Sequence, residues 1–274
     1  MKQWKTIIAV AGLGLLGMPL LGADLQSSSQ PANFPNPGTL NYVEGEVYFN
    51  GVTLTNQDVA KVNLLAGQEL TTGAGKAEIL LSPGVVLRMD SNSAVKMISP
   101  SMALTQVELE HGRAGLEVDW MFKKNEVQIV DNGVTTQPIR PGYYEFDANQ
   151  PKAMVFKGKA EVLIGGAKQE ALNIHHDLAL AANSTPEKTA DSDSHPANDE
   201  LYNWSSLRSQ YLAEANSQIA GEYTAYTGFK PGWYWDPYMG VYTYLGRDLF
   251  YSPFGWGFHP WGGFNGYDAT GFYG

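Results

Sequence analysis

Residues 76–89, which read KAEILLSPGVVLRM, decide the fold of this chain. Two mainly apolar runs flank the triplet Ser82-Pro83-Gly84. Short runs rich in Val, Ile and Leu that are separated by Pro and Gly are typical of β-strands joined by a tight turn. We therefore predict an antiparallel hairpin with strands from Lys76 to Leu81 and from Val85 to Met89.

The same pattern extends in both directions, from Leu40 to about Ala182. The run from Leu40 to Phe49 is followed by Asn50-Gly51, a pair that favours the positive φ of a hairpin turn. His111-Gly112 is predicted to join another hairpin. Strands at this spacing, with no helical stretch between them, predict an all-β sandwich, barrel or solenoid-like roll over residues 39–182, and we favour an antiparallel sandwich or β-roll. The other expected strands are Val52 to Leu54, Gln106 to Glu110, Arg113 to Trp120, Glu126 to Val130, Tyr143 to Phe146, Ala153 to Phe156 and Ala160 to Ile164, with turns at Lys157-Gly158-Lys159 and Gly165-Gly166.

A polar segment, residues 183–198, is predicted to link this mainly β domain to one helix over residues 199–220. The helix is amphipathic, because apolar residues recur three or four positions apart. Asn198 or Asp199 can act as the N-cap, and Gly221 is placed to stop the helix. Since an apolar stripe requires a cover, we expect it to dock on the β domain. This predicted docking face consists of Leu201, Trp204, Leu207, Tyr211, Ala215 and Ile219.

Residues 221–274 form a tail in which Gly, Pro and aromatic residues dominate and aliphatic residues are scarce. This composition predicts irregular structure, because glycine loses much conformational entropy on ordering and an aliphatic core is missing. Tryptophan and tyrosine present an apolar face with a polar group, so the tail is also a candidate binding surface. Its aromatics either contact a protein, a glycan or a lipid, or pack on the β domain and the helix. The candidate binding residues are Trp233, Tyr234, Trp235, Tyr238, Trp256 and Trp261.

The N-terminus predicts export to the periplasm or the cell surface. Lys2 and Lys5 precede an apolar run from Ile7 to Leu21 that ends in small residues, which is the order of a secretory signal peptide. We assign residues 1–23 to the signal peptide and residues 24–38 to a polar, Pro-rich leader. Retention of the first segment as an uncleaved membrane anchor is the alternative. The chain has no cysteine, which excludes disulfides and thiolate metal sites.

The residue types argue against catalysis and against nucleic acid as a partner. The formal net charge is −10 and no basic block occurs, whereas phosphate contacts require clustered Lys and Arg. His175-His176 is the most prominent pair of metal-ligand type, but adjacent residues of a strand point to opposite faces. We therefore predict no catalytic residues, no metal site and no cofactor. Carboxylates that alternate along two strands are interpreted as a solvated sheet face: Glu108, Glu110, Glu117 and Asp119.

Residues 65–89, LAGQELTTGAGKAEILLSPGVVLRM, resemble the signature of the FecR periplasmic domain. Residues 155–162, VFKGKAEV, resemble the later strand pair of that domain. The resemblance covers roughly residues 40–182 and implies a fold rather than a chemistry. Its glycines are expected between strands, where turns need positive φ or close backbone approach: Gly67, Gly73, Gly75 and Gly84.

Two departures separate the chain from FecR regulators. Only six residues precede the apolar run, which is too few for the sigma-factor-binding segment that those regulators carry before their membrane span. The family's R-G-T-x-F strand is missing, and Ile139 to Phe146 occupies its place. The regulatory role that the resemblance would imply is therefore not carried over.

We expect a non-enzymatic, exported envelope protein whose FecR-like β scaffold binds a protein partner, with the aromatic tail as contact surface. Strand edges near Leu40 to Leu54 or Ala160 to Ile164 would accept an added strand from a partner. One alternative is a protein that binds peptidoglycan or polysaccharide through the tail tryptophans. Another is a receptor-type signalling component that relies on a separate transmembrane partner.

Overall fold

The predicted hairpin at residues 76–89 lies at the centre of the fold. The structure is a computed structural model that describes residues 35–165, 167–173, 176–180, 187–191, 198–225 and 228–260, without the side chains of 167–177 and 187–191. Strand β3 (Glu69–Ser82) pairs with β4 (Val85–Met89) from Ala77↔Met89 to Ser82↔Val85. Gly84 provides the turn with a φ of 80°. This hairpin is confirmed.

The first hairpin is also confirmed. Asn50 and Gly51 have φ values of 47° and 78° and join β1 (Thr39–Phe49) to β2 (Val52–Thr53). Strand β3 begins earlier than predicted, so Gly73 and Gly75 lie inside it rather than between strands. Here Gly75 pairs with Gly45 of β1 next to a bulge, and the two backbones lie so close that a Cβ at Gly75 would be 2.4 Å from the backbone nitrogen of Glu46.

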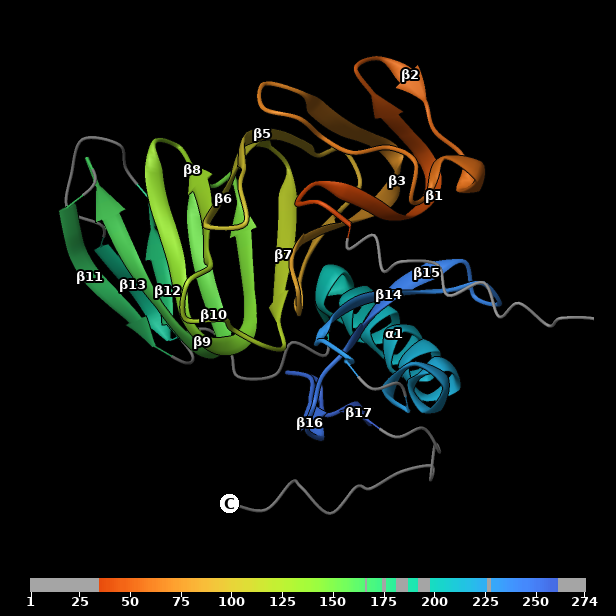
Figure 1. The fold of residues 1–274 in the computed structure, drawn as a ribbon. Helices are drawn as coiled ribbons and strands as arrows, with labels where there is room; N and C mark the ends of the chain where they lie inside the picture. The colour runs from red at the N-terminus through yellow and green to blue at the C-terminus, as the bar shows by residue number, and fades with distance from the viewer. Residues whose placement is uncertain are drawn as a thin grey trace, which may run out of the picture. The chain divides into compact units, whose positions relative to one another are not determined.

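Seven strands close into a ring in the order β9-β7-β4-β3-β5-β6-β8, because β8 pairs back with β9. The result is a mainly β, sandwich-like arrangement with one helix, as the sequence predicted (Figure 1). The pairs are antiparallel except β6 with β8, which is parallel. Beyond the ring, β10 pairs with β9, β11 and β12, and β12 pairs with β13. The remaining strands are β5 (Ala94–Pro100), β6 (Leu104–His111), β7 (Arg113–Val118), β8 (Glu126–Asp131), β9 (Val134–Asp147), β10 (Lys152–Ile164), β11 (Ala167–Asn173), β12 (His176–Ala179) and β13 (Glu187–Asp191), and a 3-10 turn covers Asn56–Asp58.

Three predictions about the strands were wrong. Strands β6 and β7 do not form a hairpin around His111-Gly112, because β6 pairs with β5 and β8 while β7 pairs with β4 and β9. Lys157-Gly158-Lys159 is not a turn, since β10 runs through it with irregular register. Strand β13 lies within the predicted linker 183–198. Glycine marks a break in regular geometry in each of the first two cases, and the pattern does not distinguish a corner or a bulge from a turn.

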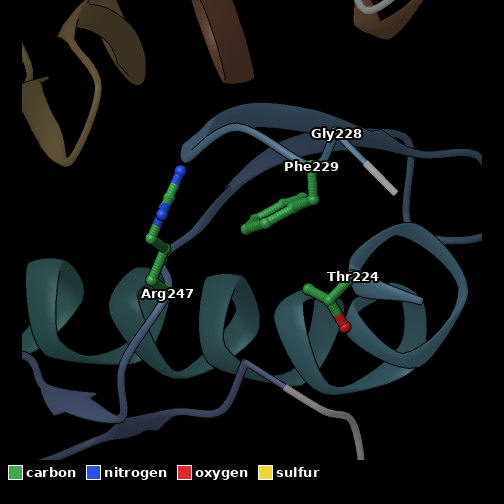
Figure 2. A pocket seen from close by; sticks show the side chains of 5 residues that line it. Thr224, Gly228, Phe229 and Arg247 are labelled. Atoms are coloured by element: carbon green, nitrogen blue, oxygen red, sulfur yellow. The ribbon is translucent and has the colours of Figure 1, made fainter. Parts of the chain in front are cut away.

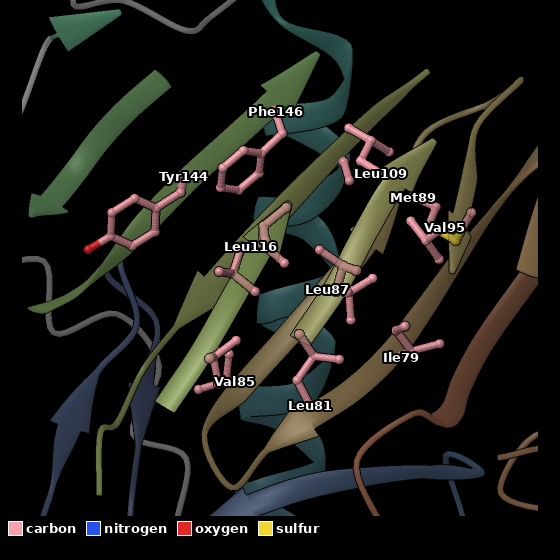
Figure 3. Close-up of a cluster of buried hydrophobic side chains, with 14 of the residues drawn as sticks. Ile79, Leu81, Val85, Leu87, Met89, Val95, Leu109, Leu116, Tyr144 and Phe146 are labelled. Carbon is pink, nitrogen blue, oxygen red and sulfur yellow. The ribbon is translucent and has the colours of Figure 1, made fainter. Parts of the chain in front are cut away.

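Strands β4 and β7 and the second halves of β3 and β9 are buried on both faces. Their inward side chains, among them Ile79, Leu87, Leu116 and Phe146, belong to the main apolar core. Figure 3 shows these side chains on the face of the sheet away from α1. The outward side chains alternate with them, and Leu80 and Val86 among them pack with Leu212 of helix α1 and with aromatic residues of the tail strands.

Helix α1 spans Glu200–Thr224. Of the two predicted caps, Asp199 is the N-cap, and it accepts hydrogen bonds from the backbone of Leu201 and Tyr202. Gly221 does not stop it. The predicted docking face is only partly correct, because Leu207 and Tyr211 are 45% and 38% exposed. The buried face contains polar residues that a search for apolar spacing overlooks: Ser205, Arg208, Ser209 and Asn216.

The prediction that the tail is irregular was wrong, because the described part of the tail forms two hairpins. Strand β14 (Gly232–Asp236) pairs with β15 (Val241–Leu245), and β16 (Phe250–Tyr251) pairs with β17 (Gly257–Phe258). Aromatic side chains replace the missing aliphatic core, and they pack with Leu80, Val86 and Leu212 in a second apolar cluster. Among the described residues, no helix has the length and apolarity to cross a membrane.

Candidate functional site

A mainly apolar groove lies at one end of the strand ring. It has a volume of about 490 Å³ and lies between the β7–β8 connection and the first half of β9. Trp120 is 36% exposed at its wall. We call it the Trp120 groove, and its lining is Trp120, Met121, Phe122, Lys123, Asn125, Glu126, Gln137, Pro138, Ile139 and Pro141.

The β7–β8 connection is held in place by the central hairpin. The backbone N–H of Asp119 donates to the carbonyl oxygen of Gly84 at 2.8 Å, and Asn125 Nδ2 donates to Ser82 Oγ at 3.1 Å. Gly84 is required here, because a Cβ at that position would lie 2.7 Å from Trp120 Cβ. Trp120 also packs against Phe250 of the tail, with ring centroids 6.3 Å apart. The groove wall is thus fixed by both the sheet and the tail.

The strand pairing opens at the groove. Strand β8 pairs with β9 only from Ile129↔Thr136 to Asp131↔Val134. Strand β7 pairs with β9 only from Gly142 onward. Residues 137–141 of β9 therefore pair with neither β7 nor β8, although β9 pairs with β10 here and Gln128 Nε2 donates to Gln137 Oε1 at 2.9 Å. From these segments, the residues that line the groove are Glu126, Gln137, Pro138, Ile139 and Pro141.

A second feature, a buried charge cluster, lies beneath helix α1. Arg88 is at its centre with no exposed surface. Its Nε donates to Glu78 Oε2 at 2.8 Å, and its Nη1 donates to Glu117 Oε2. From the helix, Arg208 Nη2 donates to Glu78 Oε1 at 3.3 Å, and Ser209 Oγ donates to Glu117 Oε1 at 2.5 Å. Charge-assisted hydrogen bonds therefore tie the helix to the sheet.

Two carboxyl groups at the cluster, those of Glu78 and Asp119, have pKa values shifted in opposite directions. Burial would raise the pKa of Glu78, but Arg208 and Arg88 outweigh burial and hold that pKa below its ordinary value. Burial, followed by the charge of Glu117, raises the pKa of Asp119 well above its ordinary value. Glu117 and Asp119 are buried, so the prediction that they belong to a solvated face was wrong. Period-two alternation separates two faces of a strand without telling which face water reaches.

A neighbouring group of charges joins the start of the helix to β7 and β9. Arg113 Nη2 donates to Glu145 Oε2 and to Asp199 Oδ2, both at 2.5 Å. The Tyr143 hydroxyl lies 2.9 Å from Glu145 Oε1 and 3.0 Å from Ser205 Oγ. Burial and then the charge of Asp199 raise the pKa of Glu145 to about 8, although Arg113 opposes the shift.

Carboxyl groups with shifted pKa values often mark catalytic sites, so the burial of these groups matters. Glu78, Glu117 and Glu145 are fully covered, and each contacts a protein cation. None of them lines the Trp120 groove. The cluster is therefore placed to hold α1 in register on the sheet rather than to meet a substrate.

The candidate binding residues of the tail have divided positions. Trp233 and Tyr234 are only 2% and 7% exposed. Because they are buried, they do not form part of a contact surface. Trp235 and Trp256 are half-buried, and Trp256 Nε1 donates to the Ser206 carbonyl oxygen at 2.9 Å. Tyr238, at the tip of the β14–β15 hairpin, is 87% exposed. Trp261 lies outside the described residues.

The other residues singled out from the sequence are also placed. On the helix, Leu201, Ala215 and Ile219 are buried, whereas Trp204 is half-buried. Gly67 has a positive φ of 82° in a turn, as predicted. His175 lies outside the described residues. Within the part of the chain that the structure describes, no group of three or more metal-ligating side chains occurs.

A smaller pocket of about 430 Å³ lies between the end of α1 and the β14–β15 hairpin. Figure 2 shows Arg247 and Phe229 above the helix that carries Thr224. Its lining, completed by Gly228 and Gly246, contains one charged group and no nucleophile placed beside a base. The Trp120 groove, with its larger apolar wall, is therefore the better candidate site.

Sequence reasoning missed the Trp120 groove. A signal was present, since Trp120-Met121-Phe122 is an apolar triplet directly after a strand, where polar turn residues are usual. A second signal was the pair Pro138 and Pro141, because proline within a strand interrupts its ladder. Neither signal shows from sequence alone that the two segments meet.

Comparison with known proteins adds little to this geometry. No family model matches the chain, and no curated protein matches it. Two solved structures, each described as a “putative anti-sigma factor” from Parabacteroides distasonis ATCC 8503, are 15% and 14% identical to it, both with a TM-score of 0.40. Each match covers 47% of this chain and 62% of the other. Similarity at this level supports no inference about activity, and the FecR resemblance stays a prediction.

Proposed function

We propose that the chain is a non-enzymatic, exported envelope protein whose β scaffold binds a protein partner through the Trp120 groove. The observation that carries the proposal is the groove itself: Trp120 is held by the sheet and by Phe250 yet remains 36% exposed, opposite Pro138 and Ile139. A rigid, partly exposed tryptophan beside apolar side chains is the composition of an interface hot spot.

The groove replaces the tail as the proposed contact surface. Burial of Trp233 and the packing of the tail on α1 support a structural role for most of the tail. Glycan binding by tail tryptophans is correspondingly less favoured, because stacking on a sugar ring requires an open aromatic face. Tyr238 alone among the described candidates is largely open.

Affinity capture from an envelope extract tests the proposal. Purified chain with Trp120→Ala is compared with unsubstituted chain and with Tyr238→Ala as a matched exposed-aromatic control. We expect one set of proteins to be retained by the unsubstituted chain and by Tyr238→Ala but lost with Trp120→Ala. Equal retention by all three, with circular dichroism confirming that each is folded, would refute the groove as the contact surface.

Export is tested separately by cell fractionation and N-terminal sequencing. Removal of residues 1–23 predicts a mature protein that begins at Asp24 in the envelope fraction. Recovery of the chain in the cytoplasm, with its N-terminus intact, would contradict export.

A further inference from the structure

We infer that the Trp120 groove receives another folded protein, whose contact surface is acidic around a protruding apolar side chain. This inference rests on the proposed function and specifies the chemistry of the partner. It follows from the cations that gather around the groove, from their lack of ion pairs within the described part of the chain, and from the shape of the groove.

Cationic residues lie around the groove on three segments that the fold brings together. Lys123 lines the groove, and Lys124 follows it on the β7–β8 connection. Arg140 of β9 lies between two residues that line the groove. The register of β9 and β10 places Lys159 opposite Arg140. We call these four cations the basic rim.

The basic rim is not neutralised from within the protein. Lys123, Lys124 and Arg140 are exposed, and none of the four cations has an ion pair with another described residue. Cations elsewhere on the sheet and the helix do have carboxylate partners, namely Lys76, Arg88, Lys96, Arg113 and Arg208. The rim is therefore free to pair with carboxylates from outside.

Two carboxylates lie close to the rim. Glu126 lines the groove, and Glu161 of β10 lies opposite Gln137. Four cations against two carboxylates leave a positive surface on a chain whose formal net charge is −10. Complementary charge steers a partner to its site and suppresses wrong contacts. An acidic partner would be attracted to this rim and repelled by the chain as a whole, so the charge directs it to the groove.

The shape of the groove favours a protein over a membrane surface. Trp120 is 36% exposed and packs against Phe250, so its ring belongs to a wall and does not protrude. Membrane-bound proteins instead insert exposed aromatic side chains among the lipids. An acyl chain in the groove would also leave the side-chain N–H groups of Gln137 without partners, which costs free energy. A protruding apolar side chain with polar neighbours, as on a protein surface, suits both features.

The test uses a displayed library of one folded three-helix scaffold with randomised surface positions. The library is selected on the full chain, and binders that also bind Trp120→Ala are removed. We expect the remaining scaffolds to carry more Asp and Glu than Lys and Arg around an apolar residue. Calorimetry should show dissociation constants that rise about tenfold or more between about 50 mM and about 500 mM salt.

Two double variants assign the effect to the basic rim. Lys123→Glu with Arg140→Glu reverses two of its charges and should weaken binding of the selected scaffolds by about tenfold or more. The control Lys61→Glu with Lys230→Glu makes the same change of net charge at two exposed cations outside the rim. The control should weaken binding by less than about threefold, because salt screens distant charges. Circular dichroism confirms that each variant folds.

Several results would overturn the inference. These are the absence of any scaffold whose binding depends on Trp120, selected scaffolds that are neutral or basic, and affinities that neither salt nor charge reversal changes. Trp120-dependent binding to vesicles of phosphatidylglycerol and phosphatidylcholine would assign the groove to a membrane instead. Trp120-dependent dimers in analytical ultracentrifugation would assign it to a second copy of this chain.

Failure of the proposed function is a separate result. It is decided by whether envelope proteins are captured in a manner that depends on Trp120, whatever their charge. Capture that depends on Trp120 but is unaffected by salt and by Lys123→Glu with Arg140→Glu would retain the proposed function and refute the acidic partner.

Discussion

Arg88 offers the sharpest test of how this protein holds its helix. The substitution Arg88→Met keeps much of the buried side-chain volume but removes the cation at the centre of the charge cluster. Glu78 would retain Arg208 and the amide of Asn41, whose Nδ2 donates at 2.8 Å. Glu117 would retain the hydroxyl of Ser209 but lose its cation.

The magnitude follows from the burial of these groups. Arg88 and Glu117 have no exposed side-chain surface, so the remaining carboxylate cannot be rehydrated without displacing α1. Breaking a buried ion pair by removing one partner costs about 3–5 kcal/mol. Because domains are stable by only about 5–15 kcal/mol, we expect a large fall in the free energy of unfolding, measured by urea denaturation with far-ultraviolet circular dichroism.

The double substitution Arg88→Met with Glu117→Leu is the matched control. It removes both Arg88 and the Glu117 carboxylate that would otherwise be left without a cation. Replacing a buried ion pair by apolar residues often leaves the stability unchanged. We expect the double variant to regain most of the loss and to lie within about 2 kcal/mol of the unsubstituted protein. A loss below about 1 kcal/mol for Arg88→Met, or a double variant as unstable as the single one, would refute this reasoning.

Three further predictions concern other parts of the fold, all measured by urea denaturation. Burial raises the pKa of Asp131 to about 7 from an ordinary 3.8, so the folded protein retains a proton that the unfolded chain loses. Stability should therefore decrease as the pH rises from about 4 to about 7, and Asp131→Asn should flatten that slope; an unchanged slope would contradict the shift. Gly75→Ala should cost about 1–3 kcal/mol because its Cβ would meet the backbone of β1. A Cβ at Gly73 would meet only the side chain of Glu46, so Gly73→Ala should cost less, and equal costs would contradict the close approach of the two backbones at Gly75. Trp233→Ala should cost about 3–5 kcal/mol and Tyr238→Ala less than about 0.5 kcal/mol, and a small effect at Trp233 would show that the tail is not part of the core.

Local chemistry accounts for the parts of the fold that were predicted from the sequence. Asn50-Gly51 and Ser82-Pro83-Gly84 produce hairpins because their backbone preferences act over four residues and need no distant partner. The N-cap at Asp199 is local for the same reason. Mainly β structure followed by a helix was therefore evident from spacing alone.

The errors lie where a residue's neighbour is distant in the sequence. The sequence pattern predicts that Glu117 is a solvated carboxylate. It is buried because α1, more than eighty positions later in the chain, places Ser209 beside it. The tail aromatics were likewise predicted to form a binding surface, but in the fold Leu80 and Leu212 pack against them. Arg88, alone in an apolar strand, was the one local hint that the outer face of the sheet is covered.

By itself, the sequence determined the two hairpins at Asn50-Gly51 and Ser82-Pro83-Gly84, the mainly β character of residues 39–182 and where the helix begins, because hydrophobic period and turn chemistry act at short range. Only the tertiary structure decided which face of each strand meets water and which strand edges stay open. The charge cluster and the Trp120 groove both depend on those decisions. The physical reason is that burial and strand pairing are properties of two surfaces in contact, and one segment of sequence describes only one of them.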